Sequence, residues 1–366
     1  NVKGLCYDDD KYISYIFIIM RYIKKEEKDM KHFVRKGLCF LTVGAMLFTM
    51  TACGGETTPE SSDGDTKAAT EGLTNDGNYV FASGGTSGTY YPLAGAIATL
   101  VNEKVAVNAT VQSTGASKEN VMLISQDEAD FAIIQNDVLD YAYNGTGLFQ
   151  ESGKVEGLAT VASIYPEVIQ VVVAADSGIN TIADLKGKRV SIGDAGSGVE
   201  QNALQVLDAY GLTVDDISVN RLSFKESGSA FKDGQIDAFF VTAGIPNTAV
   251  TELAVTRALK LVDVSGAEAD KLKEQYPFYT DVVIPKDVYK TENDITTLGV
   301  RALIVCRDDM SEEEVYNFTK AIYENLEPLG ESYAKAKEFK LEEAVLGVTV
   351  PLHPGAQKYF DEKGVK

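Results

Sequence analysis

Histidine and cysteine are scarce in this chain, which has two histidines and four cysteines among its 366 residues. His353 and Cys306 are the only ones beyond residue 53. A lone histidine such as His353 is more typical of a structural hydrogen bond than of a ligand or a general base. The sequence therefore disfavours a Cys/His metal cluster and a nucleophile activated by histidine. We expect a protein that is not an enzyme and that carries no metal and no cofactor.

Positive charge is also scarce, because 34 Lys and Arg residues stand against 54 Asp and Glu residues and leave a net charge of −20. Such an acidic balance disfavours binding to nucleic acid and to anionic lipid surfaces. It favours a soluble domain outside the cell with no nucleic-acid partner, although it does not identify the ligand.

The N-terminal region lacks an apolar run long enough to cross a membrane, since residues 37–50 fall short of the roughly 20 residues needed. They follow the basic segment 30–36, and the two together have the n-region and h-region of a secretory signal. Small residues before Cys53 resemble the lipobox of a bacterial lipoprotein, with Met50 where leucine is more usual. We predict a signal peptide over 30–52, a lipid on Cys53, and an extracytoplasmic protein held at the membrane through that lipid alone.

The segments on either side of the signal peptide have simpler interpretations. Residues 1–29 start with asparagine and add nothing that a signal peptide requires, so we interpret them as an upstream, non-native extension; the alternative is a long n-region. Residues 53–78 contain almost nothing to bury, which predicts a flexible tether. With Cys53 lipidated and Cys306 alone, the mature chain has no cysteine pair for a disulfide.

Beyond the tether, short apolar strands alternate with amphipathic helices, a pattern typical of an α/β protein with largely parallel sheets. Two runs rich in β-branched residues stand out, Val168–Ala174 and Val300–Cys306. They are either buried central strands or the strands on which the chain crosses between two lobes. Choosing the second interpretation, we predict one lobe over 79–170 plus 305–366 and another over 171–304.

Three polar turns rich in glycine and hydroxyl groups each link a predicted strand to a predicted helix, at residues 83–92, 112–120 and 193–200. Glycine lets the backbone approach a ligand closely, and the first turn of a helix offers free N–H groups that favour negative charge. Open α/β sheets bind ligands beyond the carboxyl ends of their strands. We therefore expect the three turns to meet in a cleft between the lobes.

The first turn supplies three candidate ligand-binding residues, Gly88, Thr89 and Tyr90. Tyr90 can form a wall of the pocket and donate a phenolic hydrogen bond, whereas Tyr91 lies about 100° further round the helix and packs elsewhere. The alternative is an ordinary connection between a strand and a helix, with glycines chosen for backbone conformation.

The second turn and the strand that follows it supply four more candidates. Ser117 either caps its helix or contacts the ligand, and Asn120, one turn later, can offer its amide to the ligand. Gln135 and Asp137 follow an apolar strand at its carboxyl end. Asp137 either caps the next helix or supplies the negative charge suited to a ligand ammonium group.

The remaining candidates belong to the predicted second lobe. Ser197 and Glu200 have the S-x-x-E spacing of a capping box. A cap occupies only one of the N–H groups at the start of a helix, so Ser197 and Gly198 can still hold a carboxylate with the others. The strand that begins near Asp237 ends in three further candidates, Thr242, Ala243 and Gly244.

Six motifs occur in one order over nearly the whole mature domain: Gly84–Pro92, Thr114–Asn120, Gln135–Asp137, Gly196–Glu200, Asp237–Pro246 and Pro351–Gly355. With these motifs the chain resembles the TAXI family of TRAP-transporter solute-binding proteins. The resemblance implies a two-lobed, periplasmic-binding-protein-like (type II) fold with two hinge-crossing strands. It also implies capture of a small solute outside the membrane and delivery to a membrane subunit that uses a cation gradient.

None of the six motifs contains arginine, and the mature chain has only five: Arg189, Arg221, Arg257, Arg301 and Arg307. A bidentate guanidinium clamp is therefore disfavoured, and we expect backbone N–H groups and hydroxyls to hold one carboxylate. The resemblance points to glutamate, glutamine or a related dicarboxylate. We expect a monomer that binds an acidic amino acid such as glutamate by hinge closure. The alternative function is a ligand-binding sensor module of a signalling system on the same fold.

Overall fold

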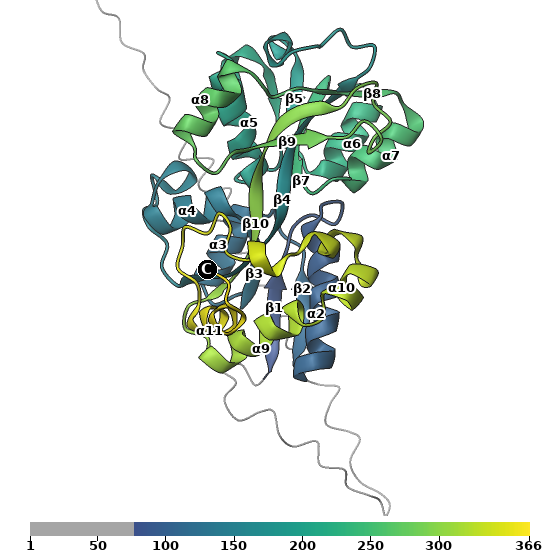
Figure 1. Ribbon diagram of the computed structural model, residues 1–366. Coiled ribbons are helices and arrows are strands. Elements are labelled where there is room, and N and C mark those ends of the chain that lie inside the picture. The colour runs from purple at the N-terminus through teal and green to yellow at the C-terminus, as the bar shows by residue number, and fades with distance from the viewer. Residues whose placement is uncertain (1–76) are drawn as a thin grey trace, which may run out of the picture. The chain divides into compact units, whose positions relative to one another are not determined.

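The computed structural model describes residues 77–366. The predicted signal peptide, the lipid site at Cys53 and almost all of the predicted tether lie outside the described residues. Within residues 77–366, no helix combines the length and the apolar character that a bilayer span requires. These residues form two lobes that share one ten-stranded β-sheet, with helices packed around the sheet in each lobe (Figure 1).

The first lobe has three parallel strands, with β1 between β2 and β3. Each strand is followed by a helix, and three helices from the C-terminal part of the chain complete the lobe. A central strand covered on both faces is apolar nearly throughout, as the fully buried sequence FAIIQ of β3 shows. The elements are β1 (Asn78–Ala82), α2 (Tyr90–Val105), β2 (Asn108–Gln112), α3 (Ser117–Ser125), β3 (Phe131–Gln135), α4 (Asn136–Asn144), α9 (Glu312–Tyr323), α10 (Leu326–Ser332) and α11 (Pro354–Lys363).

The second lobe repeats the alternation of strands and helices, with β5 between β6 and β7 in parallel. Three of its helices begin on a side-chain cap, in which Ser197, Ser223 or Asn247 accepts a hydrogen bond from a first-turn N–H group. The elements are β5 (Arg189–Ser191), α5 (Gly198–Ala209), β6 (Ser218–Asn220), α6 (Phe224–Lys232), β7 (Ala238–Ala243), α7 (Thr248–Thr256), β8 (Leu259–Val262), α8 (Ala267–Gln275) and β9 (Thr280–Ile284).

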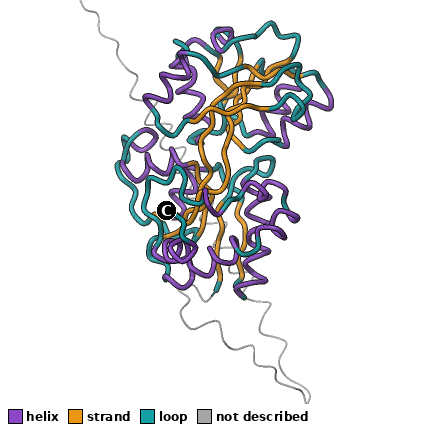
Figure 2. Tube along the Cα trace, viewed as in Figure 1, coloured by secondary structure: helices purple, strands orange, loops and turns teal. Residues whose placement is uncertain are grey.

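Two long antiparallel strands, β4 (Leu158–Ala174) and β10 (Ile295–Arg307), pass through both lobes and join them (Figure 2). The later part of β10 pairs with β3 of the first lobe, and its earlier part pairs with β9 of the second lobe. The later part of β4 pairs with β7 and β8. The strand order is β2-β1-β3-β10-β4-β7-β5-β6. The prediction of an α/β fold with two lobes and two crossing strands is therefore confirmed.

Both crossing strands start earlier than the sequence pattern suggested. β4 begins at Leu158, well before Val168, and β10 begins at Ile295, before Val300. Small and polar side chains and Pro166 interrupt the apolar pattern in the first half of β4, so a search for β-branched runs misses that half. The predicted lobe bounds at 170/171 and 304/305 fall inside these strands, and a division at those residues stays a prediction.

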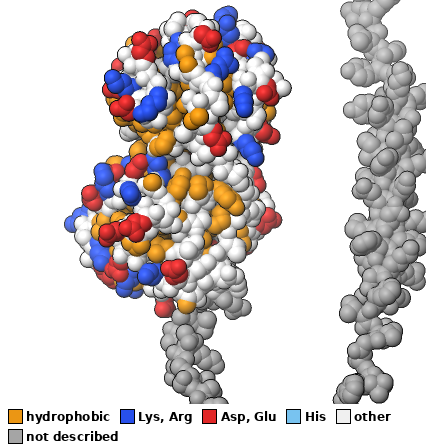
Figure 3. Space-filling view, turned by 90° about the vertical axis from the view of Figure 1, so that its right-hand side faces the viewer, with side chains coloured by type: hydrophobic (Ala, Val, Ile, Leu, Met, Phe, Trp, Pro, Cys, Tyr) orange, Lys and Arg blue, Asp and Glu red, His pale blue; other side chains and the backbone are white. Residues whose placement is uncertain are grey.

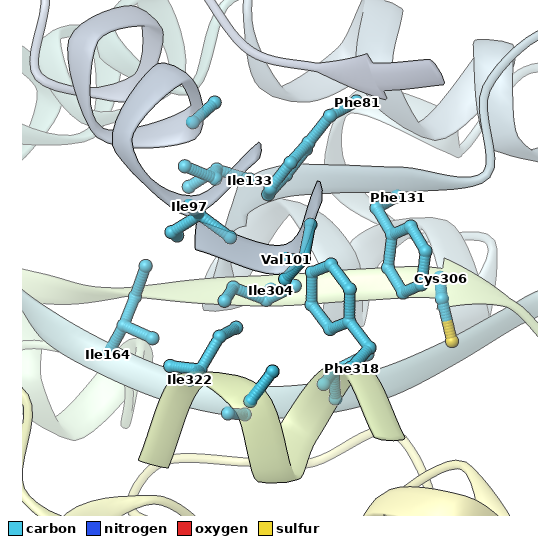
Figure 4. Packing of buried hydrophobic residues seen from close by; sticks show 14 of the residues in the cluster. Phe81, Ile97, Val101, Phe131, Ile133, Ile164, Ile304, Cys306, Phe318 and Ile322 are labelled. Carbon is cyan, nitrogen blue, oxygen red and sulfur yellow. The ribbon is translucent and has the colours of Figure 1, made fainter. Parts of the chain in front are cut away.

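Each lobe has its own apolar core. In the first lobe, Phe318 of α9 stacks on Phe131 of β3 with the ring centroids 3.9 Å apart, and Phe81 and Ile97 belong to the same cluster (Figure 4). A separate cluster that includes Phe240 forms a core of the second lobe. Close-packed cores resist deformation, so each lobe has a rigid interior of its own.

Candidate functional site

A cavity of about 40 Å³ lies at the junction of the two lobes. The first lobe contributes five of the predicted residues to its lining: Gly88, Thr89, Tyr90, Ser117 and Gln135. The second lobe contributes three: Gly198, Thr242 and Ala243. On the face shown in Figure 3, acidic and basic side chains are interspersed over both lobes. The three polar turns of the sequence therefore meet at one cavity.

Four helices begin at this cavity, because its lining includes Tyr90 of α2, Ser117 of α3, Gly198 of α5 and Phe224 of α6. The N–H groups and the dipole at the start of a helix favour negative charge. Serine side chains cap α5 and α6, whereas the N-cap residues of α2 and α3 make no side-chain cap bond. Among the described residues, neither lysine nor arginine lines the cavity. An anion held here would depend on N–H groups and on the hydroxyls of Thr89 and Ser117.

Sequence reasoning missed the one charged residue of the lining, Glu167 of β4, which is only 2% exposed. Its Oε2 accepts a hydrogen bond from the Tyr90 hydroxyl at 2.8 Å, and its Oε1 accepts one from the Tyr165 hydroxyl at 3.3 Å. Burial raises the pKa of the Glu167 carboxyl to about 8. A signal was present in the sequence, because Glu167 is the one charged residue among the 17 of β4.

Asp137, which we expected to face the ligand, lies outside the lining of the cavity. Its Oδ1 accepts a hydrogen bond from the Val138 N–H group at 2.9 Å, and its Oδ2 accepts one from the Asn202 amide at 2.8 Å. Asn202 belongs to α5 of the second lobe, so the carboxylate bridges the lobes in place of the expected ligand contact. Burial raises the pKa of the Asp137 carboxyl to about 6.

Asn120 is fully buried and connects the first two turns, and it also lies outside the cavity lining. Its Nδ2 donates hydrogen bonds to the carbonyl oxygens of Ser83 at 2.6 Å and Ile133 at 2.8 Å. Its Oδ1 accepts a hydrogen bond from the Thr114 hydroxyl at 2.7 Å. In place of the expected ligand contact, its amide holds the two turns against β3.

Ser197 and Gly244 lie outside the lining as well. The Ser197 hydroxyl accepts a hydrogen bond from the Glu200 N–H group at 3.1 Å, as the capping interpretation predicts. A Cβ atom on Gly244 would lie 2.8 Å from Cε of Lys335. Gly244 thus makes room for Lys335, whose ammonium donates a hydrogen bond to the Ile245 carbonyl at 2.5 Å and links the first lobe to the second.

His353 has the structural role that we predicted. It caps α11 with its Nδ1 atom, which accepts a hydrogen bond from the Gly355 N–H group at 3.2 Å, and its Nε2 lies 3.0 Å from the Met310 carbonyl oxygen. Burial lowers the pKa of the imidazole. Within residues 77–366, no group of three or more His, Cys, Asp or Glu side chains is arranged to hold a metal ion.

A buried hydrogen-bond network joins the lobes beside the cavity. We call this network the interlobe latch; it consists of Gln135, Asp137, Tyr141, Asn202, Gln205 and Tyr279. Asn202 is its centre, because its Oδ1 accepts from the Gln135 amide at 2.9 Å and its Nδ2 donates to Asp137 and to the Tyr279 hydroxyl. Gln205 donates to the Tyr141 hydroxyl at 2.9 Å and accepts from the Tyr279 hydroxyl. The lobes are therefore in closed contact.

The raised pKa values of Asp137 and Glu167 predict that the protein loses stability as the pH rises from about 5 to about 8. A carboxyl whose folded pKa exceeds its unfolded value stabilises the fold fully below the unfolded pKa, and this contribution is lost as the pH rises through the folded pKa. For Asp137 the loss amounts to at most about 3 kcal/mol. The free energy of unfolding, measured in urea at about pH 5 and about pH 8, should therefore change less between the two pH values in Asp137→Asn than in the wild type. Equal changes would contradict the raised pKa of Asp137.

The two lobes, the two crossing strands and the cavity at their junction define a periplasmic-binding-protein-like fold of type II, as predicted. The sequence profile of the NMT1-like family matches residues 81–364, and the chain belongs to this family.

The chain is also similar to several solved structures. The alkanesulfonate-binding protein SsuA from Xanthomonas axonopodis pv. citri, bound to MOPS, is 16% identical with a TM-score of 0.44, and the match covers 78% of this chain and 83% of that one. The periplasmic aliphatic sulphonate binding protein SsuA from Escherichia coli is 16% identical with a TM-score of 0.44, and the match covers 78% and 82%. A substrate binding protein of an ABC uptake transporter from Streptococcus pneumoniae, with bound histidine, is 14% identical with a TM-score of 0.46, and the match covers 73% and 94%.

Proposed function

We propose that this protein is an extracytoplasmic solute-binding protein that captures a small carboxylate, glutamate or a related amino acid or dicarboxylate, and delivers it to the membrane subunit of a transporter. One observation carries the proposal: four helices begin at a cavity between two lobes, and no lysine or arginine among the described residues lines it. Such a site suits one carboxylate better than a multivalent anion.

The carboxylate would bind at the starts of α2 and α3. The N-cap residues of these two helices make no side-chain bond to the first-turn N–H groups, and the hydroxyls of Thr89 and Ser117 line the same cavity. Each helix start stabilises an anion by roughly 0.3–1 kcal/mol, and by up to about 2 kcal/mol where the site is partly buried. Two such starts and two hydroxyls can therefore replace the missing arginine.

Capture would proceed by closure of the lobes about β4 and β10. Both lobes line the cavity, so a solute that contacts both of them enters while the lobes are apart. The interlobe latch then forms beside the site as the lobes close. Ligand binding shifts the population toward the closed form, because only that form contacts the ligand from both sides.

Delivery is the part of the proposal that depends on the sequence motifs. The six motifs that resemble the TAXI family favour a TRAP-type membrane subunit as the partner. We propose that the protein meets this subunit as a closed monomer, and that a lipid on Cys53 keeps it at the outer face of the membrane.

A thermal-shift screen of the purified protein tests the ligand class. We expect amino acids or dicarboxylates to raise the melting temperature and sugars and inorganic anions to leave it unchanged. A ligand at 100 times its Kd stabilises the folded state by about 2.7 kcal/mol, which is readily measured. Stabilisation by sugars or phosphate alone would overturn the proposed function.

A further inference from the structure

We propose that Glu167 binds the ammonium group of the solute, which makes the solute a zwitterionic amino acid and not a simple carboxylate or dicarboxylate. This inference rests on the proposed function, because it identifies one class among the carboxylates that the cavity can hold. It also assigns to Glu167 the role that the sequence suggested for Asp137.

The geometry around Glu167 leaves it free to accept further hydrogen bonds. Its two oxygens each accept one hydrogen bond, from the Tyr90 and Tyr165 hydroxyls. A carboxylate oxygen has two acceptor sites, so each oxygen keeps one for another donor. The two tyrosines thus fix the orientation of the carboxyl group on the wall of the cavity, and its remaining acceptor capacity is available to a ligand.

Glu167 also lacks a counter-ion within the described part of the chain. No lysine, arginine or histidine of residues 77–366 forms an ion pair with it. Lys335 is the cation whose charge acts on it, but that ammonium donates to the Ile245 carbonyl and, at 2.6 Å, to Glu338. A buried carboxylate without a partner is costly, and a ligand ammonium would supply the missing charge.

The ammonium site and the carboxylate site line the same cavity. Tyr90 is the first residue of α2, where a carboxylate would bind, and its hydroxyl contacts Glu167. An α-amino acid carries both an ammonium and a carboxylate group, so it suits a cavity that offers sites of opposite preference. A dicarboxylate carries no ammonium group, so it cannot stabilise the ionised form of Glu167 in this way.

Asp137 fits this role less well than Glu167. Both of its oxygens accept hydrogen bonds from protein groups, and it lies outside the lining of the cavity. Asp137 should therefore affect closure of the lobes on any ligand, whereas Glu167 should affect only ligands that carry an ammonium group.

Calorimetric titration of the purified protein with glutamate and with glutarate, which lacks only the ammonium group, separates these roles. We expect Glu167→Gln to weaken glutamate binding by about 10- to 100-fold and to change glutarate binding less than about threefold. Asp137→Asn should weaken both ligands by similar factors. Glu252→Gln, at an exposed glutamate of α7, is the matched control and should change neither.

Proton release gives a readout that a merely structural role would not produce. Because the pKa of Glu167 is near 8, its carboxyl is mostly protonated at pH 7, and an incoming ammonium would ionise it. Titrations in two buffers of different ionisation enthalpy should show release of about one proton per glutamate in the wild type and none in Glu167→Gln. Urea unfolding checks that the variant folds, which we expect because glutamine is neutral and similar in shape to the protonated carboxyl of the wild type.

The outcomes distinguish this inference from the proposed function. Equal losses for glutamate and glutarate in Glu167→Gln, or binding of glutarate as tight as that of glutamate in the wild type, would overturn the ammonium site and leave the proposed function intact. Absence of binding by every amino acid and every carboxylate tested would overturn both.

Discussion

Asn202→Ala is expected to weaken ligand binding by about 30- to 1,000-fold. The substitution removes the centre of the interlobe latch, where Asn202 bonds Gln135, Asp137 and Tyr279. Loss of these buried hydrogen bonds, one of them to a carboxyl, costs the closed form about 2–4 kcal/mol. Calorimetric titration with an amino acid identified by the thermal-shift screen measures the effect.

A matched surface substitution separates closure from a general loss of stability. Asn293→Ala changes an exposed asparagine outside the latch and should leave the Kd unchanged. If Asn202→Ala bound the ligand with the wild-type Kd but unfolded at a lower urea concentration, we would conclude that the interlobe latch stabilises the fold as a whole and not the closed form in particular.

Gly198→Ala is expected to prevent full closure of the lobes and to weaken ligand binding by about the same factor as Asn202→Ala. In the closed form, a Cβ atom on Gly198 would overlap the side-chain amide of Gln135 and lie 3.2 Å from Cγ2 of Val138, both on the opposite lobe. Gln135 could swing away only by giving up its hydrogen bond to Asn202. Overlap and the lost bond together cost about 2–4 kcal/mol.

Gly95→Ala is the matched control for this substitution. Gly95 lies in α2, and a Cβ atom there would meet no other atom within 4 Å. The Gly95→Ala substitution should therefore leave ligand binding unchanged. The double variant Gly198→Ala with Gln135→Ala removes the overlap and should regain part of the lost affinity; no recovery would show that the added methyl group acts in another way.

The strands, the helices and the meeting of the polar turns were predictable because they depend on local patterns. Apolar runs of strand length end in glycine and hydroxyl residues, and parallel strands bring their carboxyl ends to one edge of a sheet. For this reason residues as far apart as Gly88, Ser117 and Gly198 could be assigned to one cavity before the structure was known.

The latch and Glu167 were not predictable in the same way. Asp137 and Asn202 are 65 positions apart and meet only because the lobes close. Tyr279 lies between α8 and β9, outside the regular pattern on which the sequence reasoning depended. Glu167 is a single charged residue in an apolar strand, and neither periodicity nor motif spacing distinguishes a pocket carboxylate from a strand end.

The distance between the lobes, measured with and without ligand, tests the central claim most directly. Spin labels on cysteines that replace Thr99 of α2 and Val255 of α7 would report this distance, because both positions are exposed. The native cysteines would not interfere, since Cys306 is buried and the cysteines before residue 54 can be replaced by serine. A saturating amino acid ligand should shift the wild-type distances to one shorter, narrower distribution, and the shift should be smaller in Gly198→Ala. A ligand that raised the melting temperature without changing this distance would contradict capture by closure.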